Sequence, residues 1–420
     1  MKSLLPADFR RAIDAPLRRF YTCTFLSSFG MGLTLSLYVV YLHNVRGFSM
    51  GFATLLLAAS AVAGLTTSPF WGSLTDRLGP LRVALGAYVC SAGALVAWAF
   101  ADTKPQAAIA AILLAIFGNA TWGPSSTMMS RLVSEEQRQR AFGFNFMLVN
   151  LGIGFGGLVS ASMVDLHHPM SFTTLYLFNA GIAIGTGALF LTLRRYGGPV
   201  TEHHDDPVKS AEGWREVLHD HRLVQFVLAS LVLMIGGYGS QEAGFSLFVV
   251  NNLKLPVHVI GVIFFFNTST IVLAQLWVLN KIEGRSRTRL MAITSVLWCA
   301  FWLILDVAIA LPPALAVASL CVAMVVFAIG ETMMSPVGPA LVNEIAPEHL
   351  RGRYNAAQGL TWGLANTIAP VIAAFYFNNH LGNWWPFSTG MTALAGGLLM
   401  LNLRRRLSDS EDGRKATRVA

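Results

Sequence analysis

Residues 72–82 read Gly-Ser-Leu-Thr-Asp-Arg-Leu-Gly-Pro-Leu-Arg, and this stretch decides the fold. It separates two long apolar runs, so it is a short polar loop between hydrophobic segments. Gly72 allows one helix end to approach a neighbour closely, and Gly79 allows a tight turn. Asp76 suits a position near a helix N-terminus, where negative charge is favoured by roughly 0.3–1 kcal/mol. We therefore expect this loop to join two helices and to contact a third one.

The composition around this loop requires a lipid solvent. Of the 420 residues, 54% are hydrophobic and 12% are charged, and the mean hydropathy is +0.55. Ordinary soluble domains carry roughly 25% charged residues. In a bilayer, apolar side chains can face outward, and one spanning helix needs about 20 residues. The chain is therefore long enough for about twelve spanning helices.

The apolar runs divide into six spans, a polar stretch and six more spans. We predict an all-α membrane protein with an N-terminal six-helix bundle (1–193), a cytoplasmic linker (194–222), a C-terminal six-helix bundle (223–404) and a cytoplasmic tail (405–420). The expected spans cover residues 20–42, 50–71, 81–100, 107–129, 141–164, 172–193, 223–250, 257–280, 290–310, 314–342, 354–377 and 385–403.

The basic residues support this map and orient it. All but three of the 30 lysines and arginines fall in the two terminal tails and in every second loop, and the exceptions are Arg46, Lys104 and Lys254. Cytoplasmic loops of membrane proteins carry such an excess. We therefore expect a multi-pass protein of the inner (plasma) membrane with both termini in the cytoplasm. The net charge of +8 then needs no nucleic-acid partner to explain it.

The two halves of the sequence repeat each other. Gly118, Asn119 and Pro124 in the fourth span match Gly330, Glu331 and Pro336 in the tenth span at an offset of 212 residues, and Trp71 matches Trp277 at an offset of 206. A repeat of this length indicates two related bundles with a site between them.

The loop at residues 72–82 resembles the signature loop of the major facilitator superfamily. The resemblance implies the fold of that family, with two pseudo-symmetric six-helix bundles. It also implies a conformational latch that closes the cytoplasmic side in the outward-open state, formed by Gly72, Asp76, Arg77, Gly79 and Arg82. The family usually has a basic residue where this chain has Pro80 and Leu81. The matching loop at residues 280–289 lacks the Asp-Arg pair, so a gating role and a simple orienting charge both stay open.

The tenth span and the loop after it, from Gly330 to Tyr354, are similar to the bacterial multidrug-efflux branch of drug:proton antiporters. This resemblance implies proton-driven export by alternating access between the two bundles. The fifth span carries four glycines but lacks the Gly-Pro pair of the antiporter motif, and the fourth span lacks the arginine frequent in drug–proton antiporters.

Carboxylates inside the spans are the first site candidates, because an ionised group in the membrane costs about 2.5–3.5 kcal/mol. We predict proton coupling or substrate binding at Glu331 and Glu242, together with Asn119, the counterpart of Glu331 in the repeat. Asp306 lies near a helix end and is expected to be a solvated rim residue. Polar and aromatic side chains at mid-depth are cavity candidates: Trp122, Asn145, Asn150, Tyr238, Asn267, Gln358 and Asn366.

Three functions agree with these patterns. The first is proton-linked export of small amphipathic molecules or drugs, which a drug-susceptibility panel on cells with and without the protein tests best. The second is uptake of a small nutrient such as a sugar, peptide or organic ion, and the third is a non-transporting receptor or lipid-handling scaffold. We expect a monomer in the bilayer that binds a small-molecule substrate and protons. No cofactor, metal site or enzyme activity is expected, and residues 202–206 (Glu-His-His-Asp-Asp) are expected to be solvated rather than metal-bound.

Overall fold

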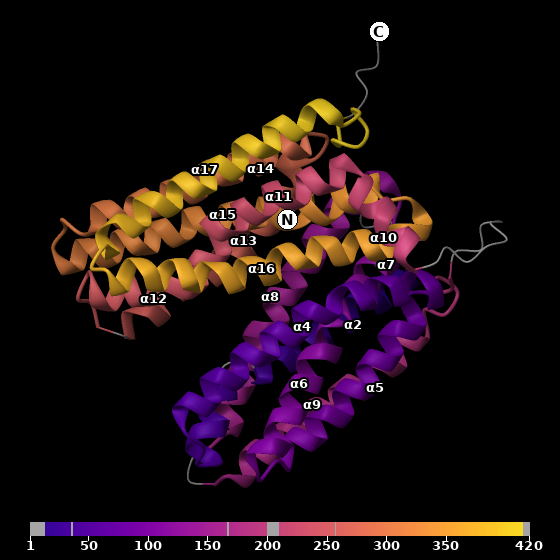
Figure 1. Ribbon diagram of the computed structural model, residues 1–420, viewed down its shortest axis with the longest axis horizontal. Helices are drawn as coiled ribbons and strands as arrows, with labels where there is room; N and C mark the ends of the chain where they lie inside the picture. The colour runs from indigo at the N-terminus through magenta and orange to yellow at the C-terminus, as the bar shows by residue number, and fades with distance from the viewer. Residues whose placement is uncertain (1–12, 35–36, 166–167, 200–209, 257, 415–420) are drawn as a thin grey trace, which may run out of the picture.

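The computed structural model describes residues 13–34, 37–165, 168–199, 210–256 and 258–414. Within these residues the chain is helical, and no strand is formed. Two groups of helices lie on either side of a central seam, with the first group in indigo and purple and the second in red to yellow (Figure 1). We call them the N-half and the C-half.

The N-half comprises the helices that precede the linker. They are α2 (Ala15–Thr34), α3 (Tyr38–Val40), η2 (Tyr41–Val45), α4 (Met50–Leu78), α5 (Pro80–Ala99), α6 (Lys104–Asn119), α7 (Trp122–Leu132), η3 (Glu135–Gln137), α8 (Arg138–Met163) and α9 (Met170–Leu191).

The described part of the linker forms one short helix, α10 (Ser210–His219), and residues 202–206 lie outside the described part of the chain. The C-half follows with α11 (His221–Met234), η4 (Ile235–Gly239), α12 (Ser240–Asn251), α13 (His258–Ile282), α14 (Arg287–Ala308), α15 (Pro313–Ile345), η5 (Glu348–Leu350), α16 (Arg351–Asn378), η6 (Gly382–Trp384), α17 (Trp385–Leu403) and η7 (Arg404–Arg406).

Ten helical stretches of the described chain are long and apolar enough to cross a membrane. The first and last expected spans, α2 and α17, are not among these ten, but both pack inside their bundles: α2 against α8 and α9, and α17 against α14 and α11. The bundles therefore contain the helices expected from the sequence, and ten of them meet the criteria for spanning on their own.

Two expected spans are interrupted in the described part of the chain. The first expected span forms α2 up to Thr34 and, after residues 35–36, the short helix α3 and a π-helical turn at Tyr41–Val45. The fourth breaks at residues 120–121 into α6 and α7. The seventh is divided by η4, where Gly237 has non-helical φ/ψ angles of −110° and −107°. Apolar periodicity predicts where a span lies, but it does not detect a local break in its hydrogen bonding.

The break at Gly237 has a clear packing cause. A Cβ atom at Gly237 would lie 2.1 Å from the ring of Trp298 in α14, so only glycine fits there. Trp298 is itself fully buried and stacks on Phe327 of α15, with ring centroids 5.1 Å apart. The kink places the next residue, Tyr238, with its ring against those of Trp298 and Phe327. This aromatic group forms part of the C-half core.

The two halves meet at one end and diverge toward the other (Figure 1). The end where they meet carries Gly79, Glu135, Gly284 and Glu348, together with α10, and we call it the basic end. Its loops are those predicted to face the cytoplasm. The other end, which carries Lys104 and Asn251, is called the opposite end.

Candidate functional site

Asp76 joins the two halves at the basic end. Its carboxylate accepts hydrogen bonds from the backbone N–H groups of Gly352 (2.6 Å) and Arg353 (3.2 Å), in the first turn of α16. The Arg353 guanidinium lies 2.9 Å from the same carboxylate, and both side chains are more than nine-tenths buried. A helix N-terminus and a guanidinium are the partners that a carboxylate binds most strongly. The contact is therefore a buried, charged clamp between α4 and α16.

Two glycines bring these helices together. A Cβ atom at Gly72 would lie 2.6 Å from Cβ of Ala356 and 3.0 Å from the Gly352 carbonyl oxygen, and a Cβ at Gly352 would lie 2.5 Å from the Asp76 carboxylate. The linker helix covers the same place, since Trp214 Nε1 donates to Ser73 Oγ at 2.7 Å. Any side chain at Gly72 or Gly352 would push α4 and α16 apart.

The remaining members of the signature loop have other surroundings. Gly79 has φ +83°, and a Cβ there would lie 2.5 Å from the carbonyl oxygen of Gly197, so both its conformation and its neighbours require glycine. Arg77 and Arg82 are exposed and do not point into the contact between the halves. Arg353, on the facing helix, supplies the cation that contacts Asp76.

The loop at residues 280–289 also contacts the other half. Glu283 is hydrogen-bonded to Arg140 at the start of α8. Arg138, two residues before it on α8, lies 3.0 Å from Glu344 of α15. Sequence reasoning missed both glutamates, although the offset of 206 residues places Asp76 only one position from Glu283. This pseudo-symmetric position was the signal available in the sequence.

A polar group that the sequence analysis did not select lies beside these ion pairs. Ser126 of α7 donates to Asn355 Oδ1 of α16 at 2.7 Å, and Asn343 of α15 donates to Ser126 Oγ at 3.2 Å. Asn343 and Asn355 are buried and also bond each other. Buried amides are costly unless satisfied, so these three residues hold the halves in one register.

Glu331 lies near the middle of α15, about 27 Å along the helix from Pro313 and about 21 Å from Ile345 at 1.5 Å per residue. Its side chain is buried and accepts a hydrogen bond from Asn267 Nδ2 of α13 at 2.5 Å. Its second partner is the Tyr238 hydroxyl group. The structure therefore brings Asn267 of α13 and Tyr238 of η4 to the carboxyl group of Glu331 on α15, and all three residues are site candidates from the sequence.

Glu242, one turn beyond Tyr238 on α12, is exposed and is hydrogen-bonded to Asn366 of α16. It lies close enough to interact electrostatically with Glu331 and Tyr238. The ring of Trp362, on α16, is 4.6 Å from the Tyr238 ring and 41% exposed. The C-half thus places two carboxyl groups and two aromatic rings next to one another, with Glu242 and Trp362 exposed and Glu331 buried; we call these residues the carboxyl surface.

The depth of this surface relative to the seam is set by α4. A Cβ at Gly363, the residue after Trp362, would lie 2.4 Å from Leu65 of α4. Leu65 therefore makes a contact between the halves, and the closed part of the seam extends from the basic end to this residue. Asn366 and Glu242 lie beyond it, toward the opposite end, where the halves diverge (Figure 1). The carboxyl surface consequently begins where the closed part of the seam stops.

Asn119 reaches the same level from the N-half. A Cβ at Gly64 of α4, next to Leu65, would lie 2.2 Å from Asn119 Nδ2, so the Asn119 amide packs on that glycine. Asn119 is exposed, ends α6 and donates back to the Ala115 carbonyl oxygen at 2.9 Å. Trp122 begins α7 and is 67% exposed. Both residues therefore lie at the depth of the carboxyl surface.

The other predicted cavity residues have local partners. Asn145 accepts from Thr24 at 2.8 Å inside the N-half, and Asn150 donates to the Phe146 carbonyl oxygen at 3.0 Å in its own helix. Gln358 packs on Gly338 of α15, within the C-half and on the closed side of Leu65. These three residues are not part of the carboxyl surface.

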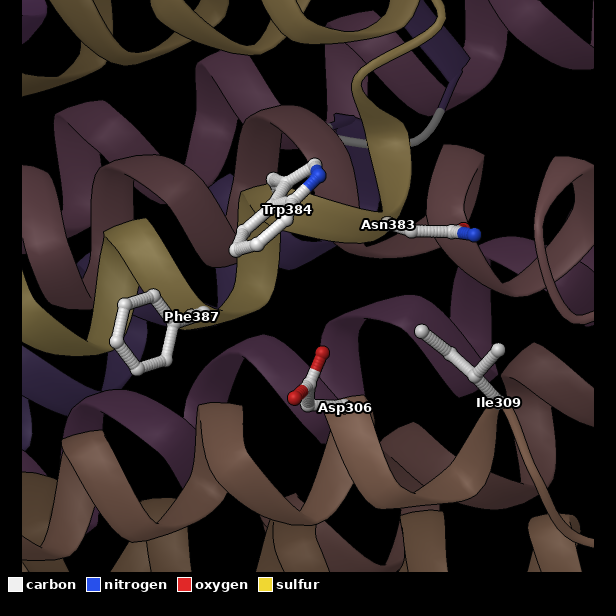
Figure 2. A pocket seen from close by; sticks show the side chains of 5 residues that line it. All are labelled: Asp306, Ile309, Asn383, Trp384 and Phe387. Atoms are coloured by element: carbon white, nitrogen blue, oxygen red, sulfur yellow. The ribbon is translucent and has the colours of Figure 1, made fainter.

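A pocket of about 260 Å³ lies elsewhere, at the opposite end of the C-half. It is lined by Asp306, Ile309, Asn383, Trp384 and Phe387, and the Asp306 carboxylate points into it (Figure 2). These residues belong to the end of α14 and the start of α17, so the pocket lies at the helix rim and away from Glu331. Asp306 is partly buried there.

Comparisons with known proteins agree with this arrangement. The sequence pattern of the Major Facilitator Superfamily matches residues 20–308 and 243–419. The chain belongs to this superfamily. A bacterial homologue of the iron transporter ferroportin, solved in an outward-facing state, superposes with a TM-score of 0.78 at 12% sequence identity, over 94% of this chain and 100% of that one. At this identity the match establishes the major facilitator fold.

Two curated relatives are an antiporter and a drug-resistance protein. A Na(+), Li(+), K(+)/H(+) antiporter of Planococcus maritimus is 24% identical over 357 residues, which are 79% of this chain and 82% of the antiporter. The quinolone resistance protein NorA of Staphylococcus aureus is 24% identical over 394 residues, 91% of this chain and 94% of NorA. This major facilitator protein is therefore a multi-pass membrane transporter related to antiporters and efflux proteins, as the sequence predicted.

Proposed function

We propose that this transporter exports small amphipathic cations in exchange for protons by alternating access, with Glu331 as the group that binds and releases the proton. The observation that carries the proposal is the pairing of Glu331 with Tyr238 and Asn267 at mid-depth, beside a second carboxyl group at Glu242. A carboxyl group in the middle of a membrane is a default candidate for ion or proton coupling.

The surroundings of the carboxyl groups support a cationic, partly apolar substrate. The partly exposed ring of Trp362 packs on Tyr238, which interacts electrostatically with Glu242, and aromatic ring faces attract organic cations by about 0.5–2 kcal/mol. A proton and a cation that compete for the same carboxylates give antiport directly, because binding of one displaces the other. The relationship to NorA agrees with this substrate class.

The shape of the seam supports an outward-open state. The buried clamps at Asp76 and Arg138 close the basic end, and the halves diverge at the opposite end (Figure 1). If the basic loops are cytoplasmic, as the distribution of lysine and arginine predicts, the carboxyl surface faces the outside of the cell. Both termini then lie in the cytoplasm of an inner-membrane protein.

Transport in proteoliposomes tests the coupling. An imposed proton gradient should drive uptake of a fluorescent organic cation into inside-out vesicles, and Glu331→Gln should abolish gradient-driven flux. Asp306→Asn is the matched control, because it removes a carboxylate from the rim of the same half and should leave flux intact. Gradient-driven flux that survives Glu331→Gln at the wild-type rate contradicts the proposal.

Cysteine labelling tests the orientation. In a background without the four native cysteines, Arg285→Cys at the basic end and Asn251→Cys at the opposite end are both exposed. An impermeant maleimide applied to whole cells should label residue 251 and should spare residue 285. The reverse pattern overturns the proposed topology and, with it, the direction of transport.

Alkali-cation exchange is the second candidate. Glu331 bonds Asn267, Glu242 bonds Asn366, and the two carboxyl groups interact electrostatically, and hard cations prefer oxygen ligands. The relationship to the Planococcus antiporter points the same way. The same vesicles with Na⁺ or K⁺ in place of the organic cation decide between the two substrates, since only the true substrate releases protons from the lumen.

A further inference from the structure

The chain does not end at α17 but folds back on the C-half. Residues 407–414, which we call the tail segment, form a compact turn in which Ser408 bonds Glu411 and the Asp412 N–H donates to the Ser408 carbonyl oxygen at 3.0 Å. Leu407 packs into the C-half core. Asp412 is completely buried. A polar tail that only followed the last helix would not bury a carboxylate in this way.

The tail segment caps the N-terminus of α14. Asp412 Oδ1 accepts from the backbone N–H and the hydroxyl group of Thr288, both at 2.9 Å, and Asp412 Oδ2 accepts from the Ser286 hydroxyl group at 2.5 Å. The backbone N–H of Arg287 donates to the Asp412 carbonyl oxygen at 2.8 Å. Two free N–H groups in the first turn of α14, those of Arg287 and Thr288, are thus satisfied by a residue more than 120 positions later in the chain, while the Arg289 N–H group donates to Ser286 Oγ.

The same contact fixes the side chain of Arg287. Arg287 Nη1 donates to the Glu411 carbonyl oxygen at 2.8 Å and lies 3.8 Å from Glu344 Oε2. Arg138 of the N-half lies only 3.0 Å from that same Glu344 oxygen. Two buried guanidinium groups therefore face one carboxylate, and the tail segment binds the one that belongs to the C-half.

We propose that the tail segment positions Arg287 so that Glu344 pairs with Arg138, and thereby stabilises closure of the basic end. Without the tail segment, Arg287 loses its acceptor at the Glu411 carbonyl oxygen and turns to Glu344, the carboxylate already 3.8 Å away, because a buried charge requires a partner. Glu344 is then shared, and its bond across the seam weakens. Arg287 and the tail segment are positioning residues in this scheme, since neither touches substrate.

A second path connects the tail segment to the Asp76 clamp. Glu411 lies 2.5 Å from Arg222, Arg222 pairs with Asp220 at 2.8 Å, and Asp220 accepts from the Tyr354 hydroxyl group at 2.8 Å. Tyr354 follows Arg353, the cation that binds Asp76. The tail segment is therefore linked, through Arg287 on one side and Arg222 on the other, to the two helices of the C-half that hold the N-half, α15 and α16.

Distances between spin labels test the proposal without any transport assay. Labels at Leu78 and Arg285, which are exposed on opposite halves at the basic end, form the basic-end pair, and labels at Lys104 and Asn251 form the opposite-end pair. Removal of residues 407–420 should raise the population with a long basic-end distance at least threefold and should shorten the opposite-end distance in that population. Removal of residues 415–420 alone is the matched control and should change neither.

The decisive comparison uses Arg287→Met. In that background there is no competitor for Glu344, so removal of residues 407–420 should no longer change the basic-end population. An equal effect of the truncation with Arg287 or Met at this position overturns the proposal and assigns the tail a general stabilising role. An unchanged population in the truncated wild-type background also overturns it.

A milder variant guards against misfolding. Asp412→Asn keeps the chain length and should raise the open population in the same direction, again only when Arg287 is present. The proposal rests on the alternating access of the proposed function, but its readout is a distance in substrate-free protein. If Glu331→Gln keeps the wild-type flux while truncation still opens the basic end, only the proposed function fails. If Glu331→Gln abolishes flux while truncation leaves both distances unchanged, only the present proposal fails.

Discussion

The fourth and tenth spans occupy equivalent places in the two halves, yet one is broken and the other continuous. In the N-half, α6 ends at Asn119 and α7 starts at Trp122, whereas α15 runs unbroken from Pro313 to Ile345. Asn119 is exposed and bonds its own helix, while Glu331 at the equivalent position is buried between Tyr238 and Asn267. The two spans thus correspond in position but differ in chemistry, because the ionisable groups of the carboxyl surface, Glu331 and Glu242, lie in the C-half.

The largest effect is expected from moving the carboxyl group across the repeat. The double variant Asn119→Glu/Glu331→Asn keeps the number of carboxyl groups but removes the one held by Tyr238 and Asn267. Because the N-half supplies no equivalent partners, proton-driven flux should fall at least tenfold, which corresponds to about 1.4 kcal/mol. Flux assays in proteoliposomes measure it. Flux retained in the double variant would mean that the two halves are interchangeable at this depth.

The two loops at the basic end should also differ. The Asp76 side chain is 6% exposed and that of Glu283 is 27% exposed. Breaking a buried ion pair costs about 3–5 kcal/mol, whereas pairs open to solvent contribute about 0–1 kcal/mol. Asp76→Asn should therefore open the basic end far more than Glu283→Gln does, as read by the basic-end spin-label pair. Equal opening by both variants would make the two loops equivalent latches.

The third comparison concerns two places where helices of the two halves approach each other closely. A Cβ at Gly72 meets Ala356 and backbone atoms of α16, whereas a Cβ at Gly143 of α8 meets only the methyl groups of Leu279 on α13. Overpacking against a rigid neighbour costs about 1–3 kcal/mol, while a leucine side chain can rotate away. Gly72→Ala should thus shift the protein toward an open basic end, and Gly143→Ala should change the label distances little. A larger effect at Gly143 would reverse the ranking of the two contacts.

The smallest effect concerns pH and the tail segment. Burial alone would raise the pKa of Asp220 and of Glu411, but hydrogen bonds from Arg222 and Tyr354 to Asp220, and from Ser408 and Arg222 to Glu411, outweigh it and lower both pKa values. A carboxyl group with a lowered pKa stabilises the folded form above its unfolded pKa, and that contribution is lost as the pH falls through the folded value.

Docking of the tail segment should therefore be constant from neutral pH down to about 5 and should weaken only below the usual carboxyl range of about 3.9–4.3. The rate of proteolysis within residues 407–414, measured against pH with a protease active in acid, reports it. A substitution of Glu411 by Gln should abolish part of this dependence. Release of the tail segment between pH 8 and 6 would contradict the assigned ion pairs.

Much of this architecture could be predicted from local sequence. Apolar length and alternating basic loops gave the two bundles, and the letters around Asp76 predicted a contact with a helix N-terminus, which the structure has at α16. The breaks at residues 120–121 and at Gly237 were not predictable, because they depend on tertiary neighbours such as Trp298. The same holds for Glu283, Glu344 and Asp412, whose partners are far away in the chain.

The site candidates illustrate the same limit. Glu331 was predicted from its cost in the membrane, and Tyr238 and Asn267 lie beside it as hydrogen-bond partners. Asn145, Asn150 and Gln358 were chosen by the same polarity argument, but their partners are local. Polarity at mid-depth identifies a residue that needs a partner. It does not tell whether that partner is a substrate, a proton or the next turn of the helix.

The unbroken course of α15 has a mechanical consequence. Glu331 and Glu344 are on the same helix, thirteen residues or roughly 20 Å apart, with Pro336 and Pro339 between them. If Glu331 takes up and releases the proton, as proposed, a tilt of α15 at that level also moves Glu344 and its bond to Arg138. In the N-half, the break at residues 120–121 separates Asn119 on α6 from Ser126 on α7. Of these two equivalent spans, the tenth is therefore the one that connects the level of the carboxyl groups to the basic end through a continuous helix.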